Sequence, residues 1–353
     1  MSADTNQEMA GLDAATSRAV GLLAKARLPL IAGLGTDVEG VRAALRLAHR
    51  TGAAVDHVGA AHIAGELRMV ADAGSMTTTL AEARNRGDLI VVCGEGARRW
   101  IEETAPFASS ETPYDWRGER TLLCLGCTAP TSVAAVAASE EIAGDPVDLL
   151  RELKAAIGGR PSSVVHETAV AKLREARFGV FVTDPRDFDH LGLELAQALV
   201  KDLNETTRFT SISVPAPAHG RGANLVSAWT TGGRLRVGFG RGFPEQDDWR
   251  FSAERLVADG EADLLIWVGA LVPDLPDYAA SLPTIALVPP GAQATADVVI
   301  EVGVPGIHHD AVLTDAVRDA FTFVEASDIA TWPSVATVLD GIAAALDAGR
   351  ENA

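Results

Sequence analysis

The sequence predicts an α/β protein built on parallel, doubly wound sheets. Short apolar segments alternate with segments of helical spacing along the 353 residues, an order that is typical of strand–helix–strand crossovers. The connections between these segments are short, as such crossovers require. Residues 89–93 are apolar at every position, which is typical of a strand covered on both faces.

The first half of the chain predicts a strand, a tight turn and a series of crossovers. The turn Gly33-Leu34-Gly35-Thr36-Asp37 ends in residues that cap helices, so a helix is expected from residue 38. Ligands gather beyond the carboxyl ends of strands, so the loops at 59–62 and 74–79 are candidates for chemistry. The predicted elements are a helix over 14–26, strands at 28–32, 53–58, 89–93 and 121–125, and helices over 38–49, 80–86, 97–104 and 146–157.

The second half repeats the alternation after the turn-forming residues 158–163. These residues mark the predicted boundary between a first α/β domain, residues 28–160, and a second, residues 161–353, with an N-terminal extension over 1–27. The segment from 178 onward is expected to form a second doubly wound sheet. Its predicted elements are helices over 166–176, 191–203, from 224 to about 229 and 335–348, and strands at 178–182, 209–214, 235–239, 264–269, 284–288 and 298–302.

Composition excludes several classes of function. The net charge of −18 argues against nucleic-acid binding or attachment to an anionic membrane. No apolar run reaches the roughly 18 residues that a membrane span needs. Three cysteines are too few for a secreted disulfide scaffold, so a reducing cytoplasm is expected.

Local motifs are weaker than their spacing suggests. Cys124 and Cys127 have zinc or redox spacing, but Cys93 does not complete a second pair, so two ordinary thiols are the simpler interpretation. Val38 stands where a dinucleotide fingerprint needs its third glycine. His308 and His309 could bind a metal, but adjacent histidines in a strand face opposite ways, so a surface loop is the simpler interpretation.

Four segments carry a resemblance to a known family. They are residues 79–91 (Thr-Leu-Ala-Glu-Ala-Arg-Asn-Arg-Gly-Asp-Leu-Ile-Val), 222–232 (Gly-Ala-Asn-Leu-Val-Ser-Ala-Trp-Thr-Thr-Gly), 239–244 (Phe-Gly-Arg-Gly-Phe-Pro) and 297–307. Together they resemble the B-type subunit of formylmethanofuran dehydrogenase, and the similarity covers most of residues 28–345. The resemblance implies sheets of the molybdopterin-oxidoreductase (formate dehydrogenase-like) type, without the family's N-terminal iron–sulfur segment.

The departures from that family concern its cofactor. The resemblance places Ala61 at the metal-binding cysteine and His62 at the neighbouring histidine, so the thiolate ligand is missing. We therefore expect no molybdopterin, tungstopterin or iron–sulfur cofactor and no metal. A vestigial, non-catalytic cofactor pocket is expected at Ala61, His62, Thr77, Thr78, Asn224, Trp229, Thr230, Arg241, His308 and His309. Within it, Asn224 should cap or bridge a turn, and Trp229 should fill volume.

This profile is similar to the short B-type subunit of bacterial formyltransferase/hydrolase complexes. The resemblance implies a structural subunit of a complex that passes a formyl group from tetrahydromethanopterin to a methanofuran-like carrier and releases formate. Its implied partners are a zinc-dependent amidohydrolase-type subunit, a formyltransferase subunit and a C-type subunit. Residues 105–120 and 240–250 carry loop aromatics that suit interfaces. Two alternatives remain: an active tungsten or molybdenum subunit without a cysteine ligand, and a nucleotide-binding module.

Overall fold

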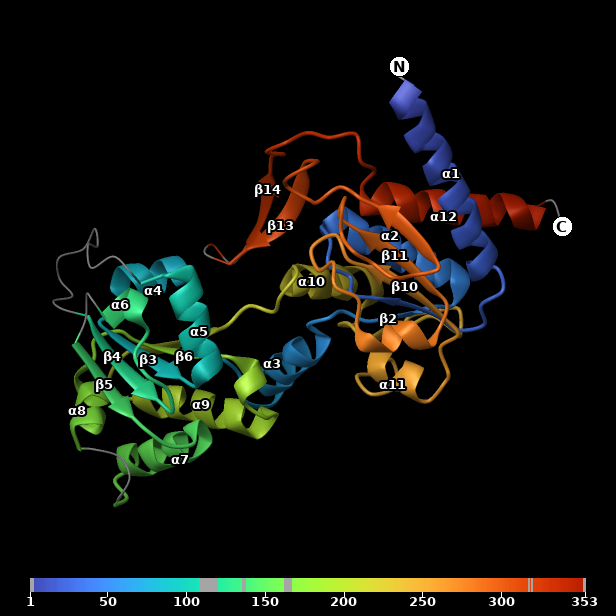
Figure 1. The fold of residues 1–353 in the computed structure, drawn as a ribbon. Coiled ribbons are helices and arrows are strands. Elements are labelled where there is room, and N and C mark those ends of the chain that lie inside the picture. The colour runs from blue at the N-terminus through green and yellow to red at the C-terminus, as the bar shows by residue number, and fades with distance from the viewer. Residues whose placement is uncertain are drawn as a thin grey trace. The chain divides into compact units, whose positions relative to one another are not determined.

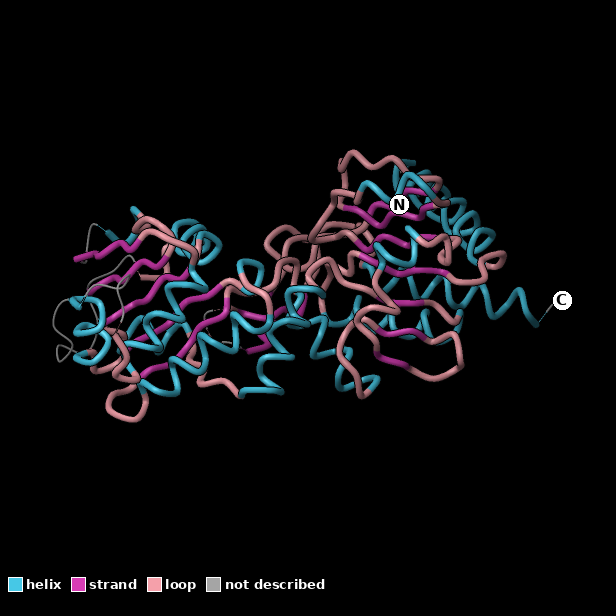
Figure 2. Tube along the Cα trace, turned by 90° about the horizontal axis from the view of Figure 1, so that it is seen from below, coloured by secondary structure: helices cyan, strands magenta, loops and turns pink. Residues whose placement is uncertain are grey.

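The computed structural model describes residues 3–107, 120–134, 138–161, 167–316, 318 and 320–351. The chain divides into two compact units. Unit 1 comprises Met1–Ala61, Ala216–Thr314 and Phe321–Ala353, and unit 2 comprises His62–Pro215 and Asp315–Ala320. Each unit contains one large sheet bordered by helices (Figures 1 and 2). No helix within the described ranges is long and apolar enough to cross a membrane.

Unit 1 is built on a seven-stranded sheet in the order β12-β11-β10-β1-β2-β8-β9. The first five strands in this order run parallel, and β8 and β9 are joined antiparallel at one edge. Because β1 continues to β2 on one side and pairs with β10 on the other, the order of winding reverses between β1 and β10. The strands are β1 (Pro29–Ala32), β2 (Ala54–Val55), β8 (Val237–Gly238), β9 (Glu245–Gln246), β10 (Leu264–Val268), β11 (Thr284–Val288) and β12 (Val298–Glu301).

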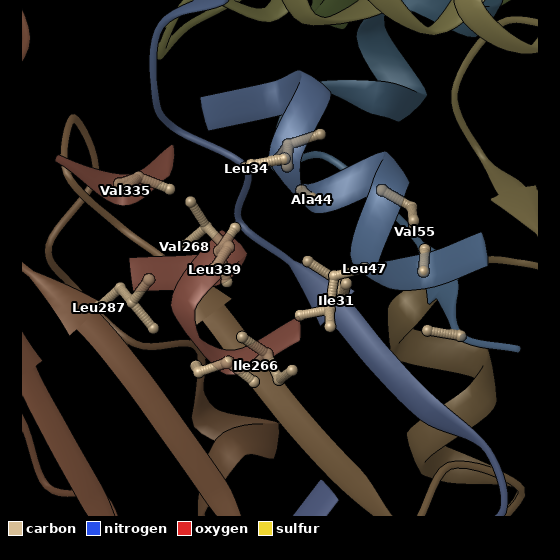
Figure 3. Packing of buried hydrophobic residues seen from close by; sticks show 14 of the residues in the cluster. Ile31, Leu34, Ala44, Leu47, Val55, Ile266, Val268, Leu287, Val335 and Leu339 are labelled. Carbon is tan, nitrogen blue, oxygen red and sulfur yellow. The ribbon is translucent and has the colours of Figure 1, made fainter. Parts of the chain in front are cut away.

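Successive side chains of these strands point to opposite faces of the sheet and pack into two separate cores. Ile31 and Ile266 face the core shared with the long helices, whereas Leu30 and Leu265 face the opposite core. Figure 3 shows the first of these, where Leu47 and Leu339 lie over the strands. The helices of the first face are α1 (Ala3–Leu23), α2 (Val38–Thr51), α10 (Gly220–Thr231) and α12 (Val335–Glu351), and the other face carries α11 (Ala253–Ala258) and the short helix η3 (Asp277–Ser281).

Unit 2 is built on a five-stranded, fully parallel sheet in the order β5-β4-β3-β6-β7. Its winding reverses between β3 and β6. The strands are β3 (Leu89–Cys93), β4 (Thr121–Leu125), β5 (Ala138–Ile142), β6 (Gly179–Thr183) and β7 (Phe209–Ser213). One face packs against α7 (Pro146–Ile157), α8 (Glu167–Glu175) and α9 (His190–Leu203), and the other against α4 (Leu80–Arg86), α5 (Glu95–Thr104) and α6 (Thr131–Ala134).

The observed division of the chain differs from the predicted boundary at residue 160. The turn at Gly158 only ends α7, and β6 then pairs in parallel with β3 of the same sheet. The chain leaves unit 2 after β7, at Pro215-Ala216-Pro217. The predicted N-terminal extension also belongs to unit 1, because Ala19 and Leu23 of α1 are buried in its core.

Other differences are local. The predicted strand at 53–58 is only two residues long, and the predicted loop at 59–62 largely forms the first turn of α3 (Ala60–Ala73). Alanine has the highest helix propensity, so Ala60 and Ala61 extend the helix that follows. Elements that were not expected from the sequence are β5, α11 and the two-stranded sheet of β13 (Ala311–Asp315) and β14 (Ala320–Val324).

Candidate functional site

The residues of the predicted pocket fall on both units. His62, Thr77 and Thr78 belong to unit 2, and the other seven belong to unit 1. Each unit has its own carboxyl edge, where the winding reverses and where ligands of such sheets usually bind.

His62 is buried at the carboxyl edge of unit 2, whereas the neighbouring Ala61 is exposed. The Nε2 atom of His62 lies 2.9 Å from the carbonyl oxygen of Val214, so this nitrogen carries the proton and donates. Its Nδ1 atom lies 3.9 Å from Oδ1 of Asp184 and has no hydrogen-bond partner among the described residues.

Burial is the largest influence on His62 and lowers the pKa of its imidazole below the usual value. The charge of Asp184 and the Val214 carbonyl oppose this shift, and the charge of Arg186 adds to it. A lowered pKa favours the neutral ring at pH 7. His62 is thus a hydrogen-bonded buried histidine in this unit.

Two carboxylates, those of Asp184 and Asp187, follow the carboxyl end of β6, where the winding of the sheet reverses. Asp184 is fully buried and accepts hydrogen bonds from Nε of Arg186 at 3.0 Å and from Nη2 at 2.6 Å. Burial tends to raise the pKa of Asp184, but the hydrogen bonds and charge of Arg186 outweigh it, so the pKa lies below its usual range. Asp187 accepts a hydrogen bond of 2.6 Å from the backbone N–H of Gly96, in the first turn of α5.

The fit between these carboxylates and α5 leaves no room for larger groups. A Cβ atom at Gly94 would lie 2.6 Å from Oδ2 of Asp187, and one at Gly96 would lie 2.5 Å from Oδ2 of Asp184. A helix N-terminus of this kind commonly holds a ligand's phosphate. Here the protein's own Asp187 occupies one of the amides that a phosphate would use.

Backbone hydrogen bonds at the carboxyl edge of unit 1 connect the loop after β1 with the end of β10. Gly33 and Leu34 adopt positive φ angles of 78° and 53°. The N–H of Gly35 donates to the Val268 carbonyl oxygen at 2.9 Å, and the N–H of Leu271 donates to the Gly35 carbonyl oxygen at 2.8 Å. The predicted tight turn and helix start are confirmed, since Asp37 caps α2 by accepting from the N–H of Gly40 at 3.0 Å.

A second buried histidine supports this edge. His57 follows β2, accepts from the N–H of Gly59 at 2.7 Å and donates to the carbonyl oxygen of Ala218 at 3.1 Å. Burial lowers the pKa of His57 to about 4, although the Ala218 carbonyl works in the opposite direction. The adjacent Asp56 accepts a hydrogen bond of 3.2 Å from Arg236, yet burial raises the pKa of its carboxyl.

The remaining residues of the predicted pocket have ordinary structural partners or face solvent. Thr77 is exposed beside β7, and Thr78 donates a hydrogen bond of 2.8 Å to Glu82. Asn224 is buried, and its side-chain oxygen accepts from the N–H of Leu235 at 3.2 Å, which confirms the predicted bridging role.

Trp229 does not fill a buried volume, and that prediction is wrong. Its side chain is 57% exposed at the C-terminal end of α10 and rests against Phe321, with ring centroids 5.2 Å apart. Its position follows from helix geometry, because Ala223 and Val226 lie on the buried face of α10 and Trp229 lies outside that face. Thr230 is exposed as well.

Arg241, His308 and His309 lie in loops of unit 1. Arg241 pairs with Glu245 at 3.1 Å. His308 accepts from the N–H of Val304 at 3.0 Å, and Nδ1 of His309 donates to the carbonyl oxygen of Asp310 at 2.9 Å. Among the described residues, no group of three or more His, Cys, Asp or Glu side chains is placed to hold a metal ion.

The structure thus identifies residues that the sequence analysis missed. Asp184, Arg186 and Asp187 follow directly after β6 and close the ligand edge of unit 2. Their signal was available in the sequence, since Thr183-Asp184-Pro185-Arg186-Asp187 places charged side chains immediately beyond a predicted strand.

The family's molybdenum or tungsten cofactor does not fit these residues. A soft metal centre needs a thiolate or equivalent ligand, which Ala61 cannot supply. The three thiols of the chain, Cys93, Cys124 and Cys127, are free and belong to or follow β3 and β4 of unit 2. With Asp184 and Asp187 seated at the edge of the sheet, a bound pyrophosphate would also meet two carboxylates.

Two wound, largely parallel sheets define the chain as an α/β protein of two units. No family model matches the sequence. The chain is 27% identical over 315 residues to the B-type subunit of the tungsten-containing formylmethanofuran dehydrogenase 2 of Methanocaldococcus jannaschii, covering 81% of this chain and 72% of that protein.

A similarity with higher identity defines the family. The chain is 38% identical over 340 residues to the B-type subunit of the formyltransferase/hydrolase complex Fhc of Methylorubrum extorquens, covering 94% of this chain and 93% of that protein. The crystal structure of that complex with methylofuran contains a chain that matches with a TM-score of 0.87, over 96% of this chain and 97% of the other. The chain belongs to the family of B-type subunits of formyltransferase/hydrolase complexes.

Proposed function

We propose that this chain is a non-catalytic, structural subunit of a formyltransferase/hydrolase complex. The observation that carries the proposal is the 38% identity to the B-type subunit of such a complex over 94% of the chain. In the proposed complex, a formyl group passes from tetrahydromethanopterin to a methanofuran-like carrier and is hydrolysed to formate. The other subunits, a zinc-dependent amidohydrolase-type protein, a formyltransferase and a C-type subunit, perform or support these steps.

The residues at the carboxyl edges of the two sheets support a subunit without redox chemistry. Ala61 offers no ligand to a metal, and Asp187 occupies an amide at the N-terminus of α5 where a ligand's phosphate would be expected. His62 is held by Val214 and lies beside Asp184, so its role is to fill and order the edge of unit 2. We further propose that the complex works in the cytoplasm, where the three thiols of this chain stay reduced.

Metal analysis of the subunit, purified together with its native partners, tests the cofactor part of the proposal. We expect no tungsten, molybdenum or iron in stoichiometric amount that is assignable to this chain. A value near one tungsten or molybdenum atom per chain would show an active oxidoreductase subunit instead.

Turnover of formyl carrier to formate by the reconstituted complex tests the non-catalytic role. His62→Ala should leave this rate within about twofold, because no proton transfer depends on the imidazole. Its burial means that the variant will be less stable, so the assay is run at a temperature at which circular dichroism shows the complex folded. A loss of about 100-fold, which is roughly 2.7 kcal/mol of transition-state stabilisation, would contradict the proposal.

A further inference from the structure

We propose that a patch of aromatic and arginine side chains on unit 1 binds another protein subunit of the complex. This inference rests on the proposed function, since it assumes that the chain works in an assembly. The patch, called here the aromatic–arginine patch, lies beside the edge strand β9 and comprises Arg241, Phe243, Trp249, Arg250 and Arg255.

Both rings of the patch are exposed in their own unit. Trp249 is 70% exposed and Phe243 is 49% exposed. Large aromatic side chains contribute most when they are buried, so two exposed rings on one loop segment leave binding free energy unused in the isolated chain. Tryptophan and arginine are also among the residues most enriched in interface hot spots.

Each exposed ring is already held in place by an arginine. The guanidinium of Arg255 lies 4.5 Å from the ring centroid of Trp249, and that of Arg241 lies 5.3 Å from the centroid of Phe243. Arg255 is itself fixed, because it donates to the carbonyl oxygens of Trp249 at 3.1 Å and of Arg250 at 2.6 Å. A rigid patch loses little conformational entropy on binding, which favours affinity.

The two halves of the patch are joined through one carboxylate. Oε1 of Glu245 lies 3.1 Å from Nη1 of Arg241 and 3.5 Å from Nη1 of Arg250. Arg250 is in turn connected to Arg255 through its carbonyl oxygen. These contacts therefore connect the segment that carries Phe243 with the segment that carries Trp249.

The charge that faces solvent differs between the two ends. Around Glu245 the two arginines are exposed, at 64% for Arg241 and 50% for Arg250, whereas Glu245 itself is 20% exposed. Around Trp249 the order is reversed. There Arg255 is 12% exposed, and its partners Asp259 and Glu261 are 51% and 49% exposed.

These charges describe the partner surface that fits. It presents apolar pockets for the two rings, carboxylates opposite Arg241 and Arg250, and a cation opposite Asp259 and Glu261. A second copy of this chain also has both signs, but two chains of net charge −18 repel each other at long range. This repulsion between two copies favours a different subunit of the complex as the partner.

The test uses the whole complex, produced from all of its subunits together. Trp249→Ala and Arg241→Glu are compared with Ile329→Ala, which removes an 82% exposed side chain of the same unit outside the patch. Affinity of this subunit for the remaining subunits is measured by titration, and thermal unfolding confirms that each variant folds. We expect Trp249→Ala to weaken binding by about 30-fold, Arg241→Glu by about tenfold or more, and Ile329→Ala by less than about twofold.

The outcomes separate this inference from the proposed function. Assembly of the wild-type subunit with unchanged affinity in both patch variants would overturn the patch and leave the proposed function standing. A wild-type subunit that does not associate with the others would overturn both. A homodimer of this chain that Trp249→Ala dissociates would show that a second copy occupies the patch, which also overturns the inference.

Discussion

The two units differ in the groups that occupy the carboxyl edge of their sheets. Both are wound sheets, and in both the protein's own groups occupy the carboxyl edge, where ligands of such sheets usually bind. Unit 1 closes it with backbone, through the positive φ angles of Gly33 and Leu34 and the hydrogen bonds between Gly35 and the end of β10. Unit 2 closes it with side chains, through Asp184, Arg186 and Asp187.

This difference determines how each edge should respond to change. A backbone closure depends on glycine and on close packing, so a single added methyl group should disturb it. An edge held by carboxylates depends on charge and on single hydrogen bonds, each worth about 1–2 kcal/mol. A substitution there should therefore lower the free energy of unfolding by a smaller amount. Four measurements test how the two units differ.

The largest effect is expected from Gly33→Ala in unit 1. The new Cβ atom would lie 2.9 Å from both the Trp267 ring and the Val268 carbonyl oxygen, at a φ angle of +78°. We expect a loss of about 3 kcal/mol in the free energy of unfolding, measured with urea. Gly291→Ala is the control, because it has φ +76° and open space, and should cost only about 1 kcal/mol. Equal losses in the two variants would mean that close packing does not hold this edge.

Acid should weaken unit 1 through His57. Its folded pKa of about 4 lies below the unfolded value of 6.5, so the unfolded state binds the proton first as the pH falls. Stability from the neutral ring is therefore present above pH 6.5 and is lost between pH 6.5 and 4. By this linkage, the loss should reach about 2 kcal/mol at about pH 4.5 relative to about pH 7.

The measurement compares urea unfolding of the wild type with that of His57→Gln at both pH values. The variant should lack this part of the pH dependence, whereas substitution of the exposed His49 by glutamine should keep it. The same slope in all three proteins would exclude His57 as the source.

Asp187→Ala tests the side-chain closure of unit 2. The N–H of Gly96 loses its acceptor and the N-terminus of α5 loses an adjacent negative charge, so we expect a cost of about 1–2 kcal/mol. Asp145→Ala, which removes the cap of α7 away from the point where the winding reverses, is the matched control for a lost cap. Phosphate at millimolar concentration should raise the melting temperature of Asp187→Ala but not that of the wild type. No response in either protein would show that Asp187 does not stand in for a ligand's anion.

The smallest effect is expected from Trp229→Ala. An exposed ring in contact with Phe321 contributes about 1 kcal/mol or less. A loss of about 3 kcal/mol or more on urea unfolding would restore the interpretation of Trp229 as a volume-filling residue.

The predicted interface loops have separate outcomes. Tyr114 and Trp116 lie outside the described residues, so the prediction for 105–120 stays a prediction. For residues 240–250, Phe243 and Trp249 are exposed, which is the arrangement that an interface requires. The contacts of these two rings with the guanidinium groups of Arg241 and Arg255 are visible only in the structure.

The sequence by itself determined the elements whose signal is local. Apolar runs located β4 at 121–125 and β11 at 284–288, and turn and capping residues located the start of α2. The residue type alone shows that Ala61 has no thiol, whereas the expected loss of a metal ligand at this position rests on the family resemblance. Such features depend on neighbours within a few positions, and these are fixed by the chain itself.

Only the tertiary structure decided how the elements combine. β1 and β10 are far apart in the chain and still pair, and β6 joins β3 across a turn that the sequence marks as a boundary. The seating of Asp187 on α5 and the orphaned Nδ1 of His62 likewise depend on which strands become neighbours. Strand pairing at long range is set by the burial of whole faces rather than by any local pattern, and a linear sequence does not display those faces.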